Sequence, residues 1–199
     1  MIIVGLCGGS GSGKGAVSAI LNELGFPTVD TDSIYHDITS HPSLCLSELS
    51  MEFGTGIIRD GALDRRALAS IVFGEDAPRS LLDKLNAITH KHVLSETRRI
   101  IDGLSAEGHR AVFVDVPLMF ESGFDRECDV IVSVTAPIEK RIERITLRDN
   151  ISREEAVRRI ASQRSDEWLK EHSDHVIENC DDLDSLRRSV NELIIKILR

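Results

Sequence analysis

Long apolar runs, paired cysteines and an excess of positive charge are all missing from this sequence, and each absence excludes a class of protein. No apolar run approaches the roughly 18 residues that a membrane-spanning helix needs. The apolar residues at the N-terminus have no basic region before them, so we expect a buried strand there rather than a signal peptide. We therefore expect no membrane association.

The cysteines are too scattered to indicate a metal site or a disulfide framework. None of the four forms a C-x-x-C pair with another, and they stand at Cys7, Cys45, Cys128 and Cys180. Free thiols of this kind are typical of a reducing compartment, so we expect the protein to be cytoplasmic.

The charge balance argues against nucleic acid as a partner. The formal net charge is −9, whereas a protein that binds duplex nucleic acid needs a basic face to neutralise phosphates. A small phosphorylated substrate needs only local positive charge, and the arginines within residues 141–164 supply it. The 199 residues contain no internal repeat and suffice for one α/β domain with a small attached lobe.

Apolar segments separated by helical stretches predict a doubly wound α/β fold. Near-continuous Val and Ile content is typical of parallel strands that are buried on both faces. We expect five strands, at residues 2–7, 27–30, 111–116, 129–135 and 175–178.

The predicted domain has a core and two excursions. The core comprises about residues 1–39, 106–135 and 165–199. Residues from about 40 to 105 have no convincing strand and predict an inserted helical lobe on the substrate side of the crevice. Residues from about 136 to 164 predict a helical lid of two helices, and Ser152 with Glu155 forms a capping box at the start of the second.

The loop after the first strand has the spacing of a phosphate-binding P-loop. Gly8 is followed after four residues by Gly13 and Lys14. Glycines let backbone N–H groups turn toward phosphate oxygens, and the lysine reaches the β- and γ-phosphates. A glycine-rich turn without a ligand, or a dinucleotide fingerprint, would not need Lys14. The residue after this lysine is normally Ser or Thr, whose hydroxyl holds Mg²⁺, but here it is Gly15.

Acidic residues follow two of the predicted strands and are candidates for proton transfer or metal binding. Asp30 and Asp32 end the second strand, where a carboxylate faces the ligand crevice. The alternative for Asp32 is the N-cap of the next helix. Asp115 ends the third strand beside the P-loop strand, and its alternative is a buried hydrogen-bonding role.

Three arginines lie on one face of the first lid helix. Arg141, Arg144 and Arg148 are spaced three and four residues apart. Such a stripe is often only a solvated surface, but on a mobile helical pair it neutralises charge on a transferred phosphoryl group.

Taken together, these segments resemble the dephospho-CoA kinase family of P-loop kinases over nearly the whole chain. The resemblance rests on GLCGGSGSGKG, LGFPTVDTDSIYHDI, DGALDRRALASIVF, LNAITHKHV, VFVDVPLMFESG, RIERITLRDNISREEAVRRIASQ and SDHVIEN. It implies ATP-dependent phosphorylation of the 3′-hydroxyl of dephospho-CoA, with Mg²⁺ as cofactor, in the last step of coenzyme A synthesis.

The resemblance also implies a role for each matching residue. Asp32 is the general base, and Lys14, Arg144 and Arg148 complete the catalytic set. The ATP site comprises Gly9, Ser10, Gly11, Ser12, Gly13, Lys14, Gly15, Ala16 and Asn179. The dephospho-CoA side comprises Asp32, His36, Arg65, His90, Asp115, Leu118 and Glu121. Asp32 and Asp115 are the candidate metal ligands.

Three positions depart from the family pattern and leave alternatives open. Gly15 replaces a serine, His36 replaces an arginine, and Lys91 replaces a proline. The alternatives are a kinase for another nucleoside or small alcohol, and a nucleotide-binding protein whose catalysis Gly15 impairs. We expect small-molecule substrates only, and a monomer or weak homo-oligomer.

Overall fold

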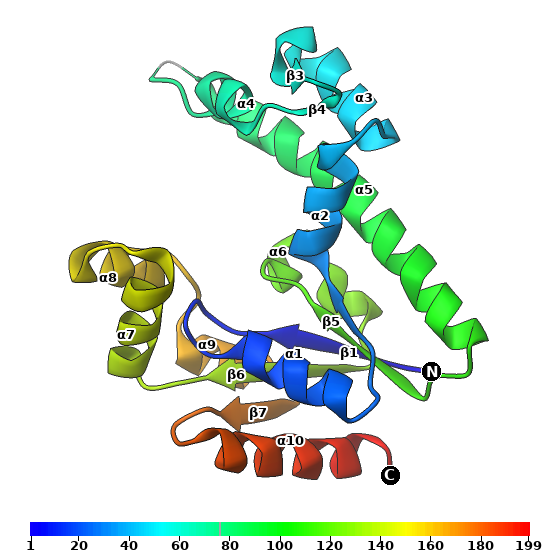
Figure 1. The fold of residues 1–199 in the computed structure, drawn as a ribbon, viewed down its shortest axis with the longest axis vertical. Coiled ribbons are helices and arrows are strands. Elements are labelled where there is room, and N and C mark those ends of the chain that lie inside the picture. Colours follow the sequence, from blue (N-terminus) through cyan, green and yellow to red (C-terminus); the bar gives the residue numbers. More distant parts are fainter. Residues whose placement is uncertain (76) are drawn as a thin grey trace. The chain divides into compact units, whose positions relative to one another are not determined.

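Five strands pair into the parallel sheet that the sequence predicts, in a computed structural model that describes residues 1–75 and 77–199 (Figure 1). The strand order is β2 (Thr28–Asp30), β5 (Ala111–Asp115), β1 (Ile2–Cys7), β6 (Val130–Thr135) and β7 (His175–Glu178). β1 pairs in parallel with β5 and β6, and β6 pairs in parallel with β7. The predicted α/β class is confirmed, and strand ends differ from the predicted ones by no more than one residue.

Two helices cover one face of this sheet. α1 (Lys14–Glu23) packs against α10 (Leu183–Ile197), and α10 also contacts β7. Alternate residues of β1, Val4 and Leu6, are fully buried in the core that these helices form with the sheet. Because successive side chains of a strand point to opposite faces, this alternation fixes which face the helices cover.

The register of the strands brings their carboxyl ends to one edge of the sheet. Leu6 of β1 lies opposite Asp115 of β5, and Cys7 lies opposite Ser133 of β6. Thr135 of β6 lies opposite Glu178 of β7. The segments that follow β1, β5, β6 and β7 therefore start from the same edge, where parallel sheets bind ligands.

The lid segment forms the two helices that the sequence predicts. α7 (Ile138–Asp149) ends at Asn150, which has a left-handed conformation, and α8 (Arg153–Ala161) follows. The predicted capping box is present, with both hydrogen bonds between Ser152 and Glu155. α9 (Asp166–Glu171) then leads into β7, while α6 (Met119–Ser122) and the 3₁₀ turn Phe124–Glu127 follow β5.

The chain folds into two compact units, one of residues 1–29 with 103–199 and one of residues 30–102. The second unit contains α2 (Thr31–Ser40), α3 (Leu44–Phe53), the 3₁₀ turn Thr55–Ile57 and α4 (Arg65–Val72). It also contains most of α5 (Arg79–Ala106), whose last turn lies in the first unit. Its core consists of Cys45, Leu49, Ile57, Leu68, Val72 and Ile88.

One expectation for this region was wrong, because it does contain strands. β3 (Ile58–Arg59) and β4 (Ala62–Leu63) form an antiparallel hairpin. Asp60 and Gly61 at its turn both have positive φ, the conformation that favours an Asp-Gly pair. Strands of two residues are too short to show the alternation by which a strand is recognised in a sequence.

None of the helices within residues 1–75 and 77–199 combines the length and apolar character that a bilayer crossing needs. All four cysteines are free thiols.

A matched pair of substitutions on α10 tests the core. Leu193 is 5% exposed within the core, whereas Ile195, two residues on, is 53% exposed. Leu193→Ala should lower the free energy of unfolding by about 2–5 kcal/mol, since it removes buried methyl groups and leaves a cavity. Ile195→Ala should change it by no more than about 1 kcal/mol. Urea unfolding measures both, and equal effects would contradict this core.

Candidate functional site

The phosphate loop, residues 8–13, connects β1 to α1 at the ligand edge of the sheet. Gly13 is the N-cap of α1 with φ 102°, and Lys14 is the first helical residue. The Lys14 ammonium donates to the carbonyl oxygen of Gly8 at 3.0 Å and lies 3.7 Å from Oδ1 of Asp115. The side chain therefore curls back along the loop and reaches the end of β5.

Side chains from distant segments hold the outer side of this loop. The amide Nδ2 of Asn179, just after β7, donates to the carbonyl oxygen of Ser12 at 2.9 Å. Nη1 of Arg144 donates to the carbonyl oxygens of Gly11 and Ser12, at 3.1 and 3.3 Å. Buried carbonyl groups must find donors, and these contacts leave the inner side of the loop for a ligand.

The three lid arginines all reach the phosphate loop, as their shared helical face predicts. Nη2 of Arg148 lies 3.5 Å from the hydroxyl of Ser10, and its Nε donates to Asp149 at 2.7 Å. Asp149 also accepts from Arg159 of α8. The hydrogen bond from Arg148, followed by that from Arg159, lowers the pKa of Asp149 to about 2. The carboxylate stays ionised and ties the two lid helices together.

The segment after β5 forms one wall of a cavity of about 400 Å³ beside the loop. Leu118 is 50% exposed there, and Glu121 accepts a hydrogen bond from Nε of Arg164 at 3.1 Å. Cys7 also lines the cavity, but burial raises the pKa of its thiol to about 11. This thiol is protonated at neutral pH, so it is no nucleophile.

The structure shows which of the two carboxylates at the end of β2, both within the unit of residues 30–102, caps the next helix. Asp30 is the N-cap of α2, and its side chain accepts from the backbone N–H of Asp32 at 2.9 Å and from the hydroxyl of Ser33. The alternative in which Asp32 caps this helix was therefore wrong. Asp32 lies exposed in the first turn of α2.

Two residues predicted for the acceptor side meet within the same unit. Nη2 of Arg65 lies 2.8 Å from Nδ1 of His36, and the Arg65 guanidinium lies over the ring of Tyr35 at 5.7 Å. His90 is half-buried on α5, and burial lowers its pKa, which keeps its imidazole neutral at pH 7. Lys91, beside it, pairs with Glu48.

Few carboxylates converge at the phosphate loop. No group of three or more His, Cys, Asp or Glu able to hold a metal occurs in the part of the chain that the structure describes. Asp115 is the carboxylate beside Lys14. Mg²⁺ keeps several waters and needs only one or two carboxylates besides substrate phosphates, so these residues fit an ion that arrives with a nucleotide. They do not fit an all-protein metal cage.

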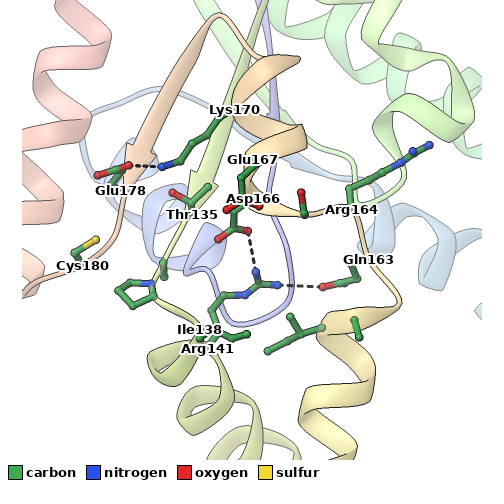
Figure 2. A pocket seen from close by; sticks show the side chains of 15 residues that line it. Thr135, Ile138, Arg141, Gln163, Arg164, Asp166, Glu167, Lys170, Glu178 and Cys180 are labelled. Atoms are coloured by element: carbon green, nitrogen blue, oxygen red, sulfur yellow. Dashed lines mark hydrogen bonds and ion pairs between the residues drawn. The ribbon is translucent and has the colours of Figure 1, made fainter.

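The sequence predicted Arg141 as a lid arginine but did not reveal that it meets Gln163 and Asp166 at the base of the lid. Arg141, Gln163 and Asp166 line a cavity of about 600 Å³ and point toward one another (Figure 2). Arg141 is 4% exposed and pairs with Asp166 at 2.8 Å. Gln163 and Asp166 lie 22 and 25 positions from Arg141, so no local pattern could pair them.

Comparison with known proteins gives one family. A family model for dephospho-CoA kinase matches residues 2–185. A dephospho-CoA kinase from Corynebacterium glutamicum is 36% identical over 199 residues, covering 100% of this chain and 98% of the relative. One from Symbiobacterium thermophilum is 39% identical over 191 residues, covering 96% of this chain and 79% of the relative.

Solved structures that resemble this chain include a member of the same family. A dephospho-CoA kinase from Campylobacter jejuni has a TM-score of 0.72 and 27% identity, covering 98% of this chain and 96% of its own. A shikimate kinase from Acinetobacter baumannii has a TM-score of 0.53 and 17% identity, covers 100% of this chain and 93% of its own, and shares only the fold. With a phosphate loop at the ligand edge and full-length relatives above 30% identity, the chain belongs to the dephospho-CoA kinase family.

Proposed function

We propose that this chain transfers the γ-phosphoryl group of ATP to the 3′-hydroxyl of dephospho-CoA and releases coenzyme A and ADP. The observation that carries the proposal is the phosphate loop with Lys14 at the ligand edge of the sheet, in a chain of this family. Phosphoryl transfer needs little covalent chemistry from the protein. Positioning and charge neutralisation therefore provide most of the catalysis.

On the nucleotide side, the loop and the lid would share the phosphates. Within Gly9 to Ala16, backbone N–H groups other than those of Ser10, Ser12 and Ala16, which donate within the protein, would bind the phosphate oxygens. Lys14 would exchange its bond with the Gly8 carbonyl for the β- and γ-phosphates. Arg144 and Arg148 lie on the lid face that already contacts the loop. Both would neutralise charge on the equatorial oxygens of the transferred phosphoryl group. Asn179 lies beside the loop, where it would contact the adenine base of ATP.

On the acceptor side, Asp32 would take the proton of the 3′-hydroxyl as general base. Its exposure leaves it accessible to a substrate, and Asp30 relieves it of the capping role. Within the same unit, Arg65 and His36 form a polar pair, and Arg65 supplies positive charge for the phosphates of dephospho-CoA. Leu118 and Glu121, in the segment after β5, are the further residues that the family resemblance implies for the dephospho-CoA side.

Asp115, beside Lys14, would hold Mg²⁺ together with the phosphates and water. Asp32 is the second candidate ligand that the sequence predicts. When bound, the ion neutralises β- and γ-phosphate charge. Gly15 offers no hydroxyl, so this chain would supply one ligand fewer than a P-loop with serine there.

A substrate panel tests the function. With ATP and Mg²⁺, we expect phosphorylation of dephospho-CoA at a kcat/KM at least about 100-fold above that for adenosine or shikimate, since remote contacts raise kcat/KM only for the cognate acceptor. Product formation is followed by coupling ADP release and by mass spectrometry. Lys14→Ala should remove turnover without changing the far-UV circular dichroism. Equal use of adenosine would favour a nucleoside kinase instead.

Substitution of Asp32 separates chemistry from folding. Asp32→Asn is nearly isosteric and removes the proton acceptor, so kcat should fall on the order of 100-fold or more. Stability should change by no more than about 0.5 kcal/mol, because Asp30 holds the helix cap. The matched control is Asp37→Asn, an exposed carboxylate on the same helix with its side chain 74% exposed. A loss of stability without a loss of kcat would count against the general base.

Restoration of a hydroxyl at Gly15 tests the metal. A Cβ built at Gly15 meets no atom within 4 Å, so serine fits without displacing a neighbour. Gly15→Ser should lower the Mg²⁺ concentration for half-maximal rate, because the ion gains a protein ligand. The measurements are a Mg²⁺ titration at saturating substrates and ATP binding with and without Mg²⁺. Gly15→Ala is the control for helix propensity, and superimposable titrations for serine and alanine would show that the hydroxyl is unnecessary.

A further inference from the structure

We propose that Arg141 and Gln163 are positioning residues, which hold the phosphate loop in its nucleotide-binding shape from outside and do not contact the nucleotide. The inference rests on the proposed binding of ATP at this loop. It assigns a function to the polar cluster at the base of the lid, Arg141, Gln163 and Asp166 (Figure 2).

Gln163 and Arg141 bind both backbone polar groups of one loop residue, Ser10. Oε1 of Gln163 accepts from the backbone N–H of Ser10 at 2.9 Å. Nε of Arg141 donates to the carbonyl oxygen of the same residue at 2.9 Å. The two side chains also meet, because Nη2 of Arg141 lies 3.4 Å from Oε1 of Gln163. The peptide groups on either side of Ser10 are thereby fixed in orientation.

The loop backbone lies directly on Arg141. A Cβ built at Gly9 would lie 2.1 Å from Nη2 of Arg141, and one at Gly11 would lie 2.6 Å from the carbonyl oxygen of Arg141. At Gly11 the backbone of α7 leaves no room for a side chain, whereas at Gly9 a side chain would have to displace the Arg141 guanidinium. The glycines thus allow the loop backbone to come close to α7 as well as to phosphate.

The charge of Arg141 is balanced inside the cluster. Nη1 of Arg141 donates to Oδ1 of Asp166 at 2.8 Å, and the arginine is 4% exposed. Burial raises the pKa of Asp166, and Arg141 opposes that effect. An arginine whose charge is balanced by a carboxylate exerts little net attraction on a phosphate. The contribution of Arg141 is therefore geometric, in contrast to that of the exposed Arg148.

Fixing the loop in advance favours nucleotide binding. Glycine loses more conformational freedom on ordering than any other residue, and the loop has four glycines in six positions, Gly8, Gly9, Gly11 and Gly13. If the fold already orders the loop, ATP binding does not have to offset the entropic cost of ordering it. Loss of either hydrogen bond to the backbone of Ser10 should therefore weaken ATP binding and leave the affinity for dephospho-CoA unchanged.

The test is ATP affinity of the full chain, by isothermal titration calorimetry with Mg²⁺, for Arg141→Lys, Gln163→Ala and the parent. Arg141→Lys keeps the positive charge but loses the planar fork of donors. Gln163 is exposed, so Gln163→Ala tests the proposal without a threat to folding. The control is Arg153→Ala, which removes an exposed ion pair with Glu139 in the same lid. Melting temperatures accompany each measurement.

We expect the Kd for ATP to rise about ten-fold or more in both variants. This is the effect expected from the loss of one hydrogen bond to a charged or buried group. The KM for dephospho-CoA should stay within about two-fold, and Arg153→Ala should bind ATP like the parent. Parental ATP affinity in both Arg141→Lys and Gln163→Ala would overturn the inference, as would lower melting temperatures with unchanged ATP affinity. A parent that binds no ATP would instead refute the proposed function.

Discussion

The carbonyl oxygens on the outer side of the phosphate loop impose the constraint on which the rest of the site depends. Those of Ser10, Gly11 and Ser12 accept hydrogen bonds from Arg141, Arg144 and Asn179. A loop that directs N–H groups to a ligand leaves carbonyls on its other side, and these need donors when they are buried. The donors come from α7 and from the end of β7. The lid base and the end of the last strand thus support the phosphate loop.

This arrangement gives the lid arginines unequal roles. Arg141 is buried and paired with Asp166, so it acts on the shape of the loop. Arg148 is exposed and pairs with Asp149, which also holds α8 through Arg159. A surface pair of this kind exchanges partners at little cost, so Arg148 can turn to a phosphate. One stripe of arginines on a helix therefore combines a buried residue that supports the loop with an exposed one that is available to a substrate phosphate.

The departures from the family pattern each have a local structural context. Nothing lies within 4 Å of a Cβ at Gly15, so the missing hydroxyl reflects no crowding. His36 bonds with Arg65, and Lys91 pairs with Glu48, so both residues are integrated into the unit of residues 30–102. His36 and Lys91 thus take part in contacts that an arginine and a proline would change.

The sequence by itself determined the five strands of the parallel sheet, the phosphate loop, the lid helices and the family, because these depend on local patterns. Val and Ile runs mark the strands, Gly8 to Lys14 mark the loop, and Ser152 with Glu155 marks the start of α8. Only the tertiary structure showed that Asp30, and not Asp32, caps α2. The structure also showed that Arg141 and Gln163 form hydrogen bonds with the backbone of Ser10. They lie 131 and 153 residues from it in the sequence. Such contacts depend on the order of the strands in the sheet, and this order cannot be derived from the spacing of residues along the chain.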